Sequence, residues 1–230
     1  MAFDPKTLPP GTVINSYGEG KESFFRKLFV KAAYAAIRAY QSDKYPDSPR
    51  VRAVHTILHL GAGRYMSVTY PRCLVETWQP TEGKLYTAWV WTGAQKLATC
   101  PEAMREMEAV AEKFRGKKYD VWQLVGIGFA RVLQEVVEMV IRRYIPSPPL
   151  GWVGKIKKLL SFQILGMGKA NTVCSAGAHA ALIGAYKKMK RLEIAVDRPL
   201  GDQFIESCTP SDFENSNTFN ELDLGIQPRL

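Results

Sequence analysis

The sequence predicts an α+β fold in which a small antiparallel sheet packs against helices, and two patterns support this expectation. Apolar and polar residues alternate over 52–60 and again over 65–70, on either side of the short turn GAGR, as in a β-hairpin. Elsewhere apolar residues recur at the spacing of one helix face. The 230 residues are 46% apolar, which suits one large core, so we expect a single domain over 1–230.

The elements around the hairpin follow from the same spacing rules. Residues 12–16 follow a proline-rich lead and are expected to form a short strand, whereas 24–40 carry apolar side chains at helical spacing. A further strand is expected over 87–92. The segment 101–114 begins with proline and an acidic residue, both favoured in the first turn of a helix, and is predicted to be helical.

The second half of the chain contains two amphipathic segments and a turn-rich tail. Charged residues interrupt the first segment and are costly in lipid, so we expect a soluble helix and no transmembrane span. The second, 152–169, is basic, and a lid or packed surface helix is preferred over a helix lying on a membrane. We expect a helical elaboration at about 125–168 and a surface-wrapping tail at about 205–230.

Positive charge is concentrated in the first 200 residues. The chain has 31 Lys and Arg against 22 Asp and Glu; residues 201–230 hold one of these bases and six of the acids, which leaves 30 bases and 16 acids before them. A basic protein face of this kind can bind an anionic surface or an acidic protein partner, while binding to nucleic acid is not expected. The alternative is a basic face that is simply solvated.

Cysteine and histidine usage argues against a metal site and against disulfides. The four cysteines show no CxxC spacing and the chain has only three histidines, so we expect neither a metal nor another cofactor. The N-terminus lacks a basic segment followed by an apolar stretch, so no signal peptide is expected. We therefore predict synthesis in the cytoplasm and free thiols.

Cys174 is the strongest candidate nucleophile. The stretch NTVCSAGAHAALIGAY resembles a strand end that turns directly into a helix, with Cys174 at the junction. A helix N-terminus stabilises a thiolate through its dipole, and its free amides can bind an oxyanion. Cys100, before the helix expected at 101–114, is its rival. The alternative for either is a buried cysteine that only packs.

A histidine on a strand can serve as the base for such a thiol. His55 and His59 are four residues apart, so on a strand their side chains share one face. Either can instead be a core histidine with satisfied hydrogen bonds. His179 lies five positions after Cys174 and would point away from it on a helix.

Five stretches occur in an order that resembles a known family. They are PPGTVINS, RAVHTILHLGAGRYMSV, GKKYDVWQL, NTVCSAGAHAALIGAY and CTPSDFENSNTF, and together they span roughly residues 8–219. This order is similar to the circularly permuted papain-fold branch of the NlpC-type cysteine hydrolases, which includes lecithin:retinol acyltransferase-like proteins. The resemblance implies a circularly permuted papain-like fold in which the sheet packs against a helix led by the nucleophilic cysteine.

The resemblance also implies roles for individual residues. It makes Cys174 the nucleophile and His55 its base, and it places Tyr119 and Asp120 beside the site. The family usually has a polar residue about a dozen positions after the histidine to orient the imidazole, and Ser67 occupies that position here. A carboxylate, an amide or a second histidine is more usual there.

The orienting residue is left open by the sequence. A three-residue turn at 61–63 would put Ser67 on the face of His55, whereas a two-residue turn would swing it away. Glu76 and Tyr65 are the other candidates.

The function implied by the resemblance is hydrolysis of a peptide, isopeptide or cell-wall amide bond through a covalent thioester. Two alternatives stay open. One is a lipid-directed acyltransferase or thioesterase served by the basic segment 152–169. The other is a catalytically weak or inactive structural or interaction protein, for example a phage particle component with a role in virion assembly. The family's Gly-Asp after the leading proline is replaced here by Gly11 and Thr12, which favours this last alternative.

Overall fold

The structure is a computed structural model that describes part of the chain. Described are residues 4–17, 35, 38–39, 41–42, 44–48, 53–68, 72–81, 85–118, 174–203, 205 and 208–224. The predicted elaboration at 125–168, Tyr119 and Asp120, the basic segment 152–169 and most of the helix expected at 24–40 lie outside these residues.

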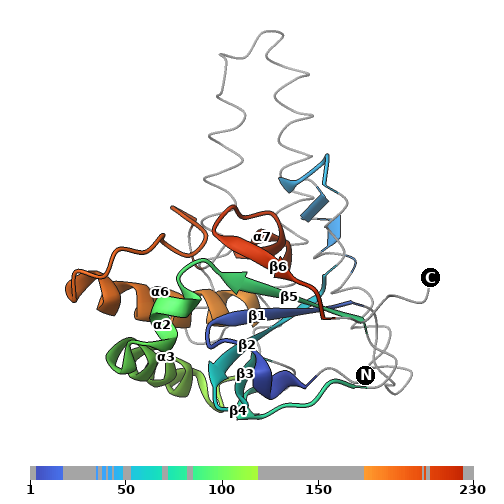
Figure 1. The fold of residues 1–230 in the computed structure, drawn as a ribbon. Helices are drawn as coiled ribbons and strands as arrows, with labels where there is room; N and C mark the ends of the chain where they lie inside the picture. The colour runs from blue at the N-terminus through green and yellow to red at the C-terminus, as the bar shows by residue number, and fades with distance from the viewer. Residues whose placement is uncertain are drawn as a thin grey trace, which may run out of the picture.

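A six-stranded antiparallel sheet forms the centre of the described fold (Figure 1). Its strand order is β4-β3-β2-β1-β5-β6. The strands are β1 (Thr12–Tyr17), β2 (His55–Gly61), β3 (Arg64–Val68), β4 (Cys73–Thr77), β5 (Leu85–Trp91) and β6 (Phe219–Leu222). The sheet and its helices confirm the expected α+β class.

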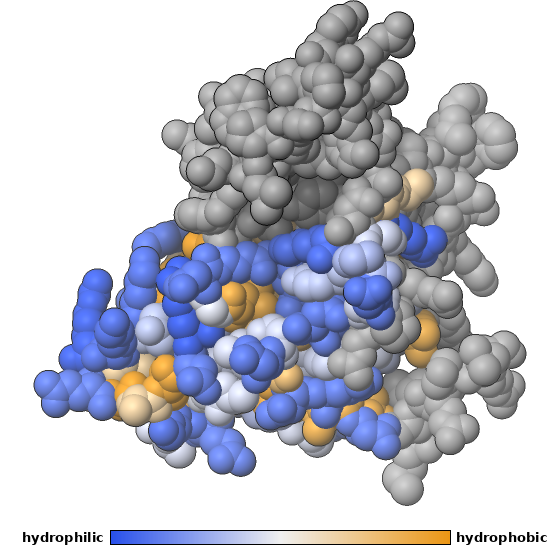
Figure 2. Space-filling model, turned by 90° about the horizontal axis from the view of Figure 1, so that it is seen from above, coloured by the Kyte–Doolittle hydropathy of each residue, from blue (hydrophilic) through white to orange (hydrophobic). Residues whose placement is uncertain are grey.

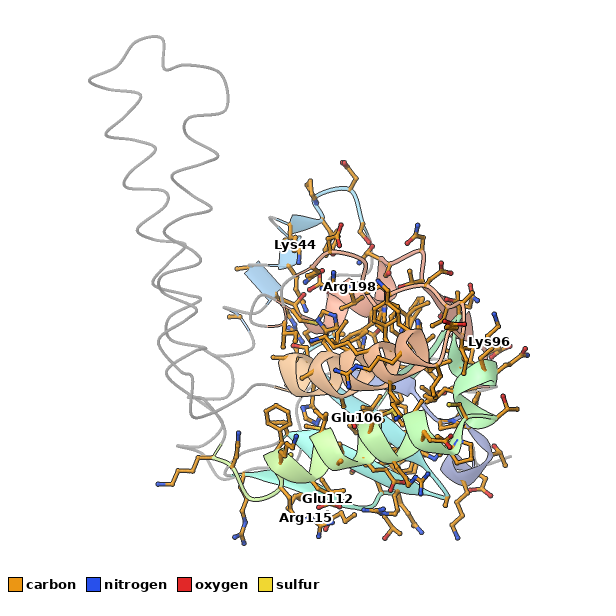
Figure 3. The ribbon with its side chains drawn as sticks, turned by 90° about the vertical axis from the view of Figure 1, so that its left-hand side faces the viewer. Lys44, Lys96, Glu106, Glu112, Arg115 and Arg198 are labelled. Atoms are coloured by element: carbon orange, nitrogen blue, oxygen red, sulfur yellow. The ribbon has the colours of Figure 1, made fainter. Side chains whose placement is uncertain are left out.

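Two helices lie side by side on one face of the sheet, as both ribbon views show (Figures 1 and 3). They are α3 (Pro101–Phe114) and α6 (Cys174–Arg191), and the short α2 (Ala94–Ala98) leads into α3. α3 has proline in its first turn, as expected. Two further short helices are η1 (Pro5–Thr7), before β1, and α7 (Pro210–Glu214), before β6.

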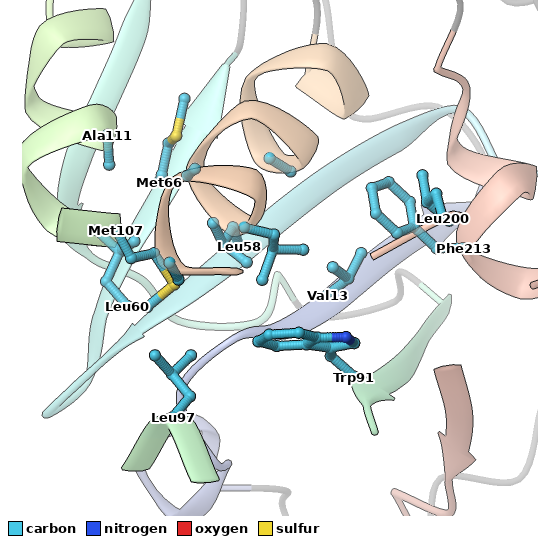
Figure 4. Close-up of a cluster of buried hydrophobic side chains, with 14 of the residues drawn as sticks. Val13, Leu58, Leu60, Met66, Trp91, Leu97, Met107, Ala111, Leu200 and Phe213 are labelled. Carbon is cyan, nitrogen blue, oxygen red and sulfur yellow. The ribbon is translucent and has the colours of Figure 1, made fainter. Parts of the chain in front are cut away.

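The main hydrophobic core fills the space between the sheet and these helices (Figure 4). Val13 of β1 and Leu58 of β2 point into it from the sheet, and both are fully buried. Their strand neighbours Ile14 and Ile57 belong to a second cluster, because successive side chains of a strand point to opposite faces. The two faces of β1 and β2 are therefore distinguished residue by residue.

The hairpin between β2 and β3 forms where the sequence predicts it. The two strands pair in the register Ile57↔Ser67, and the register shifts between His59 and Gly61. Gly61, Ala62 and Gly63 all have positive φ, at 106°, 51° and 71°. Glycine adopts such angles without steric cost, which explains the glycines at 61 and 63 but not the alanine between them.

Within the segment of about 205–230, for which a surface-wrapping tail is expected, the described residues form two elements of the fold. All five residues of α7 are buried, and Phe213 and Phe219 join the main core. β6 then extends the sheet by pairing with β5, with Trp91 opposite Phe219. These anchors are single aromatic residues in short elements, so no periodic pattern marks them in the sequence.

The described surface is mostly hydrophilic in the view from above (Figure 2). Leu192 and Leu222, 43% and 37% exposed, are the large hydrophobic side chains that stand out among the described residues. No helix within the described segments has the length and apolar character needed to cross a membrane.

Candidate active site

Cys174 is the first residue of α6, and its thiol lies against strand β2. The residue is 3% exposed. Burial raises the pKa of the Cys174 thiol, while hydrogen bonding from the backbone of Thr56, from that of Ser175 and from its own backbone lowers it. The thiol therefore sits among the first amides of the helix and beside the peptide that joins His55 to Thr56.

His55 and Ser67 form a hydrogen bond across the hairpin. His55 Nε2 and Ser67 Oγ are 3.0 Å apart. The register explains the contact: Ser67 lies opposite Ile57, two residues after His55, so both side chains leave the sheet on one face. The pairing is the one expected from a three-residue turn, but the structure reaches it differently: Gly61 pairs with Arg64 around a two-residue turn, and the register shift between His59 and Gly61 brings Ser67 to the face of His55.

The other two candidates for orienting His55 lie elsewhere on the hairpin. Tyr65 stacks on His59, with ring centroids 4.6 Å apart. Glu76 pairs with Tyr65 from β4 and is exposed. Of the three candidates, Ser67 is the one bonded to His55.

Two contacts lie next to each other at the start of β2: Cys174 lies against the backbone of Thr56, and His55 is bonded to Ser67. Thr56 and Leu58 face the helix layer, whereas Ile57 belongs to the second cluster. By this alternation the His55 ring leaves the strand on the side of Ile57. Because His55 is the first residue of β2, a contact between its ring and the thiol has to pass around the start of the strand.

The two remaining histidines are buried core residues. For His59 this agrees with the stated alternative in its burial, although Nε2 has no hydrogen-bond partner among the described residues. His59 is 1% exposed, and its Nδ1 lies 3.0 Å from the Pro9 carbonyl oxygen. Burial lowers the pKa of His59, which keeps its ring neutral. His179 is fully buried in α6, with Nε2 at 3.1 Å from the Pro199 carbonyl oxygen.

The four cysteines are free and all are buried. Burial raises the pKa of the Cys73 thiol to about 11. Cys100 precedes α3, the position that made it a rival to Cys174. Cys208 has a pKa raised well above its ordinary value, first by burial and then by the nearby Asp212 carboxylate.

A buried polar network lies beside Cys174 and is not predicted from the sequence. Asn15 Nδ2 donates to Glu214 Oε1 at 2.8 Å and to the Pro210 carbonyl oxygen at 2.9 Å, while Thr56 Oγ1 donates to Asn15 Oδ1 at 2.9 Å. Tyr17 also donates to Glu214. The partners lie up to 199 residues apart in the chain, so no local pattern links them.

Asp212, in the same short helix α7, is a second buried carboxylate with several hydrogen-bond partners. It accepts hydrogen bonds from the Thr209 backbone at 2.6 Å and from Gln203 Nε2 at 2.7 Å, and it pairs with Lys44 Nζ at 2.6 Å. Tyr45 donates to it as well. The sequence signal was available here, since Thr209 and Asp212 form a capping box with the T-x-x-D spacing.

Among the described residues, no three His, Cys, Asp or Glu side chains gather into a possible metal site. Comparison of the chain with protein-family models, curated proteins and solved structures finds no match. The assignment of a function therefore depends on the geometry of the site and on the resemblance in the order of its motifs.

Proposed function

We propose that this chain is a cysteine-dependent hydrolase with a circularly permuted papain-like fold, which cleaves a peptide, isopeptide or cell-wall amide bond. Cys174 is the nucleophile, His55 the base, and Ser67 orients the imidazole. One observation carries the proposal: the cysteine that begins α6 lies against the His55–Thr56 peptide, while His55 is bonded to Ser67.

The proposed reaction proceeds by acyl transfer to sulfur. Cys174 Sγ attacks the carbonyl carbon as its proton passes to His55, and the new oxyanion accepts hydrogen bonds from amides at the start of α6. The tetrahedral adduct collapses to a thioester, and His55 returns the proton to the leaving amine. A water molecule, deprotonated by His55, then attacks the thioester to release the carboxylic acid and the free thiol.

The environment of the thiol makes proton transfer to a base a necessary part of the attack. Burial raises the pKa of Cys174, so the resting residue is a neutral thiol at pH 7. A base within reach of the thiol is then required at the moment of attack. Because Ser67 Oγ occupies His55 Nε2, the proposed reaction uses Nδ1 to accept the thiol proton, and in that tautomer Nε2–H donates to Ser67 Oγ.

The burial of Cys174 also favours a second candidate function. A cysteine that is 3% exposed with a raised pKa is the usual condition of an unreactive packing residue. In that case the chain is a structural or interaction protein that retains the fold, and its basic surface binds an anionic surface or an acidic protein partner.

Limited alkylation distinguishes these two functions. Native protein is treated with a limiting amount of iodoacetamide near neutral pH, and the labelled peptides are mapped. We expect Cys174 to be labelled first and labelling to slow in His55→Ala, with His59→Ala as the matched control. Equal labelling of Cys73, Cys100 and Cys208, or a Cys174 that does not react at all, would support the structural protein.

A generic acyl donor tests the covalent step without knowledge of the substrate. Incubation with p-nitrophenyl acetate should release p-nitrophenol and acetylate Cys174, as detected by mass spectrometry and reversed by hydroxylamine. Cys174→Ser should lose the thioester. Acetylation that stays unchanged in His55→Ala would exclude His55 as the base.

A further inference from the structure

Hydrogen bonds link the segment that contains α7 to the residue that follows each member of the proposed catalytic pair, directly in one case and through Asn15 in the other. Ser175, directly after Cys174, donates from Oγ to the Cys208 carbonyl oxygen at 2.6 Å. Thr56, directly after His55, donates to Asn15, which in turn donates to Pro210 and Glu214. One short segment, 208–214, is thus connected to both sides of the site.

The amide of Asn15 is held in one orientation by its partners. Its oxygen accepts from Thr56, and its nitrogen donates to Pro210 and Glu214, so both N–H groups are used. Asn15 is fully buried, and Thr56 and Glu214 are 1% and 2% exposed. A buried network in which each Asn15 group has a partner is rigid and tolerates only one arrangement of β1, β2 and α7.

Stability alone does not account for this choice of residues. Desolvation of a carboxylate is costly, and well-packed apolar residues of similar volume are commonly as stable as buried polar groups. Valine in place of Thr56 or leucine in place of Asn15 would fit the apolar alternation of the neighbouring core positions Leu58 and Val13. The network instead fixes the strand at the residue whose backbone lies against the thiol.

We propose that Asn15 and Glu214 are positioning residues that hold β2 at Thr56 against the start of α6 and thereby set the approach of His55 to Cys174. This inference deepens the proposed function and rests on it. Neither residue touches the reacting atoms in the proposal. Glu214 acts through Asn15 and Thr56 on one side, and through the segment that binds Ser175 on the other.

The test measures how strongly Cys174 alkylation depends on His55. The second-order rate constant for iodoacetamide is determined in the full chain for Thr56→Val, Asn15→Ala and Glu214→Ala, each with His55 present and with His55→Ala. We expect each single variant to lower the rate about tenfold when His55 is present, because small displacements of a reacting pair are costly. With His55→Ala, the same substitutions should leave the rate unchanged.

Conservative replacement and a matched control separate positioning from folding. Glu214→Gln keeps an oxygen that can accept from Asn15 and Tyr17, and it should restore most of the rate lost in Glu214→Ala. Asp212→Asn alters a neighbouring buried acid with no bond to Asn15, and it should retain the full dependence on His55. Thermal unfolding verifies that each variant is folded. If the alanine variants do not fold, Thr56→Val decides the outcome, because it keeps the side-chain volume and the backbone N–H.

The two ways to fail are distinguishable. If His55→Ala does not slow alkylation in the otherwise unaltered chain, the proposed function fails. If His55→Ala slows it but the same rate ratio is found in Thr56→Val and Asn15→Ala, the function stands and the positioning role is overturned.

Discussion

His55 Nε2 and Ser67 Oγ lie 3.0 Å apart, on adjacent strands of one hairpin. The partner of the proposed base is thus a neutral hydroxyl that fixes the ring without adding a negative charge. A carboxylate at this position would also stabilise the imidazolium formed during attack, and a hydroxyl does so less. We therefore expect Ser67 to contribute mainly to the orientation of His55.

Ser67→Ala should slow alkylation of Cys174 by about five- to tenfold, the effect of one lost hydrogen bond. The second-order rate constant with iodoacetamide near neutral pH measures it. In a chain that already carries His55→Ala, Ser67→Ala should have no effect, since there is no ring left to orient. A loss of the same size in both backgrounds would mean that Ser67 acts on the fold of the hairpin.

The pH dependence of Cys174 alkylation should follow its raised pKa. Burial favours the neutral thiol in the folded state, so the thiolate forms at higher pH than in the unfolded chain. The rate is expected to climb with pH through the alkaline range, with a midpoint above that of the same cysteine in urea-unfolded protein. A native midpoint below the unfolded one would instead show a thiolate paired with a charged His55 at rest.

Local patterns predicted much of the sheet. The hairpin of β2 and β3 was expected because alternating strands flank the glycines of the turn, and β5 because TAWVWT alternates in the same way. The strands β4 and β6 were missed. β4 follows directly on Pro71 and Arg72 and carries three consecutive apolar residues, of which Cys73 and Val75 are buried, and β6 carries one buried residue, Phe219; neither sequence shows a strict apolar–polar alternation.

The candidate site was predictable only where its residues lie close in sequence. The spacing of 12 residues between His55 and Ser67 spans a single hairpin, so the sequence makes their contact one of the open alternatives, and the register shift in β2 decides it. Asn15 and Glu214 meet across 199 residues, and tertiary packing alone brings them together. The side of β2 from which the His55 ring emerges also depends on packing, through the cluster that includes Ile57.

His59 should make the protein less stable in mild acid. Burial lowers the pKa of His59, so below the ordinary histidine range the unfolded chain binds a proton that the folded chain does not. The stability contributed by the neutral ring is complete above the unfolded pKa and is lost as pH falls. In urea unfolding, the unaltered chain should lose about 1–2 kcal/mol more between pH 7.5 and pH 5 than His59→Asn, which does not titrate.

The same His59→Asn variant controls for a catalytic role. Its amide nitrogen can replace Nδ1 as donor to the Pro9 carbonyl, so the fold should persist at pH 7.5. Alkylation of Cys174 should stay within about twofold of the unaltered rate, because His59 has no role in the proposed reaction and a change there should not affect an independent site. An equal loss of stability in both proteins at pH 5 would show that other groups cause the acid sensitivity.

The close approach of α3 and α6 at Gly184 should make a normally favourable substitution unfavourable. A Cβ at position 184 would lie 2.9 Å from Val110 Cγ2, and the stiff valine side chain cannot swing away. Gly184→Ala would gain up to about 1 kcal/mol of helix propensity but cost about 1–3 kcal/mol through overpacking, so we expect a net loss of about 1 kcal/mol in the free energy of unfolding. With Val110→Ala the space is open, and the same Gly184→Ala substitution should then stabilise the protein by about 0.5–1 kcal/mol. Urea unfolding of the four proteins in this cycle measures both values, and an equal stabilisation with and without Val110 would contradict the close helix contact.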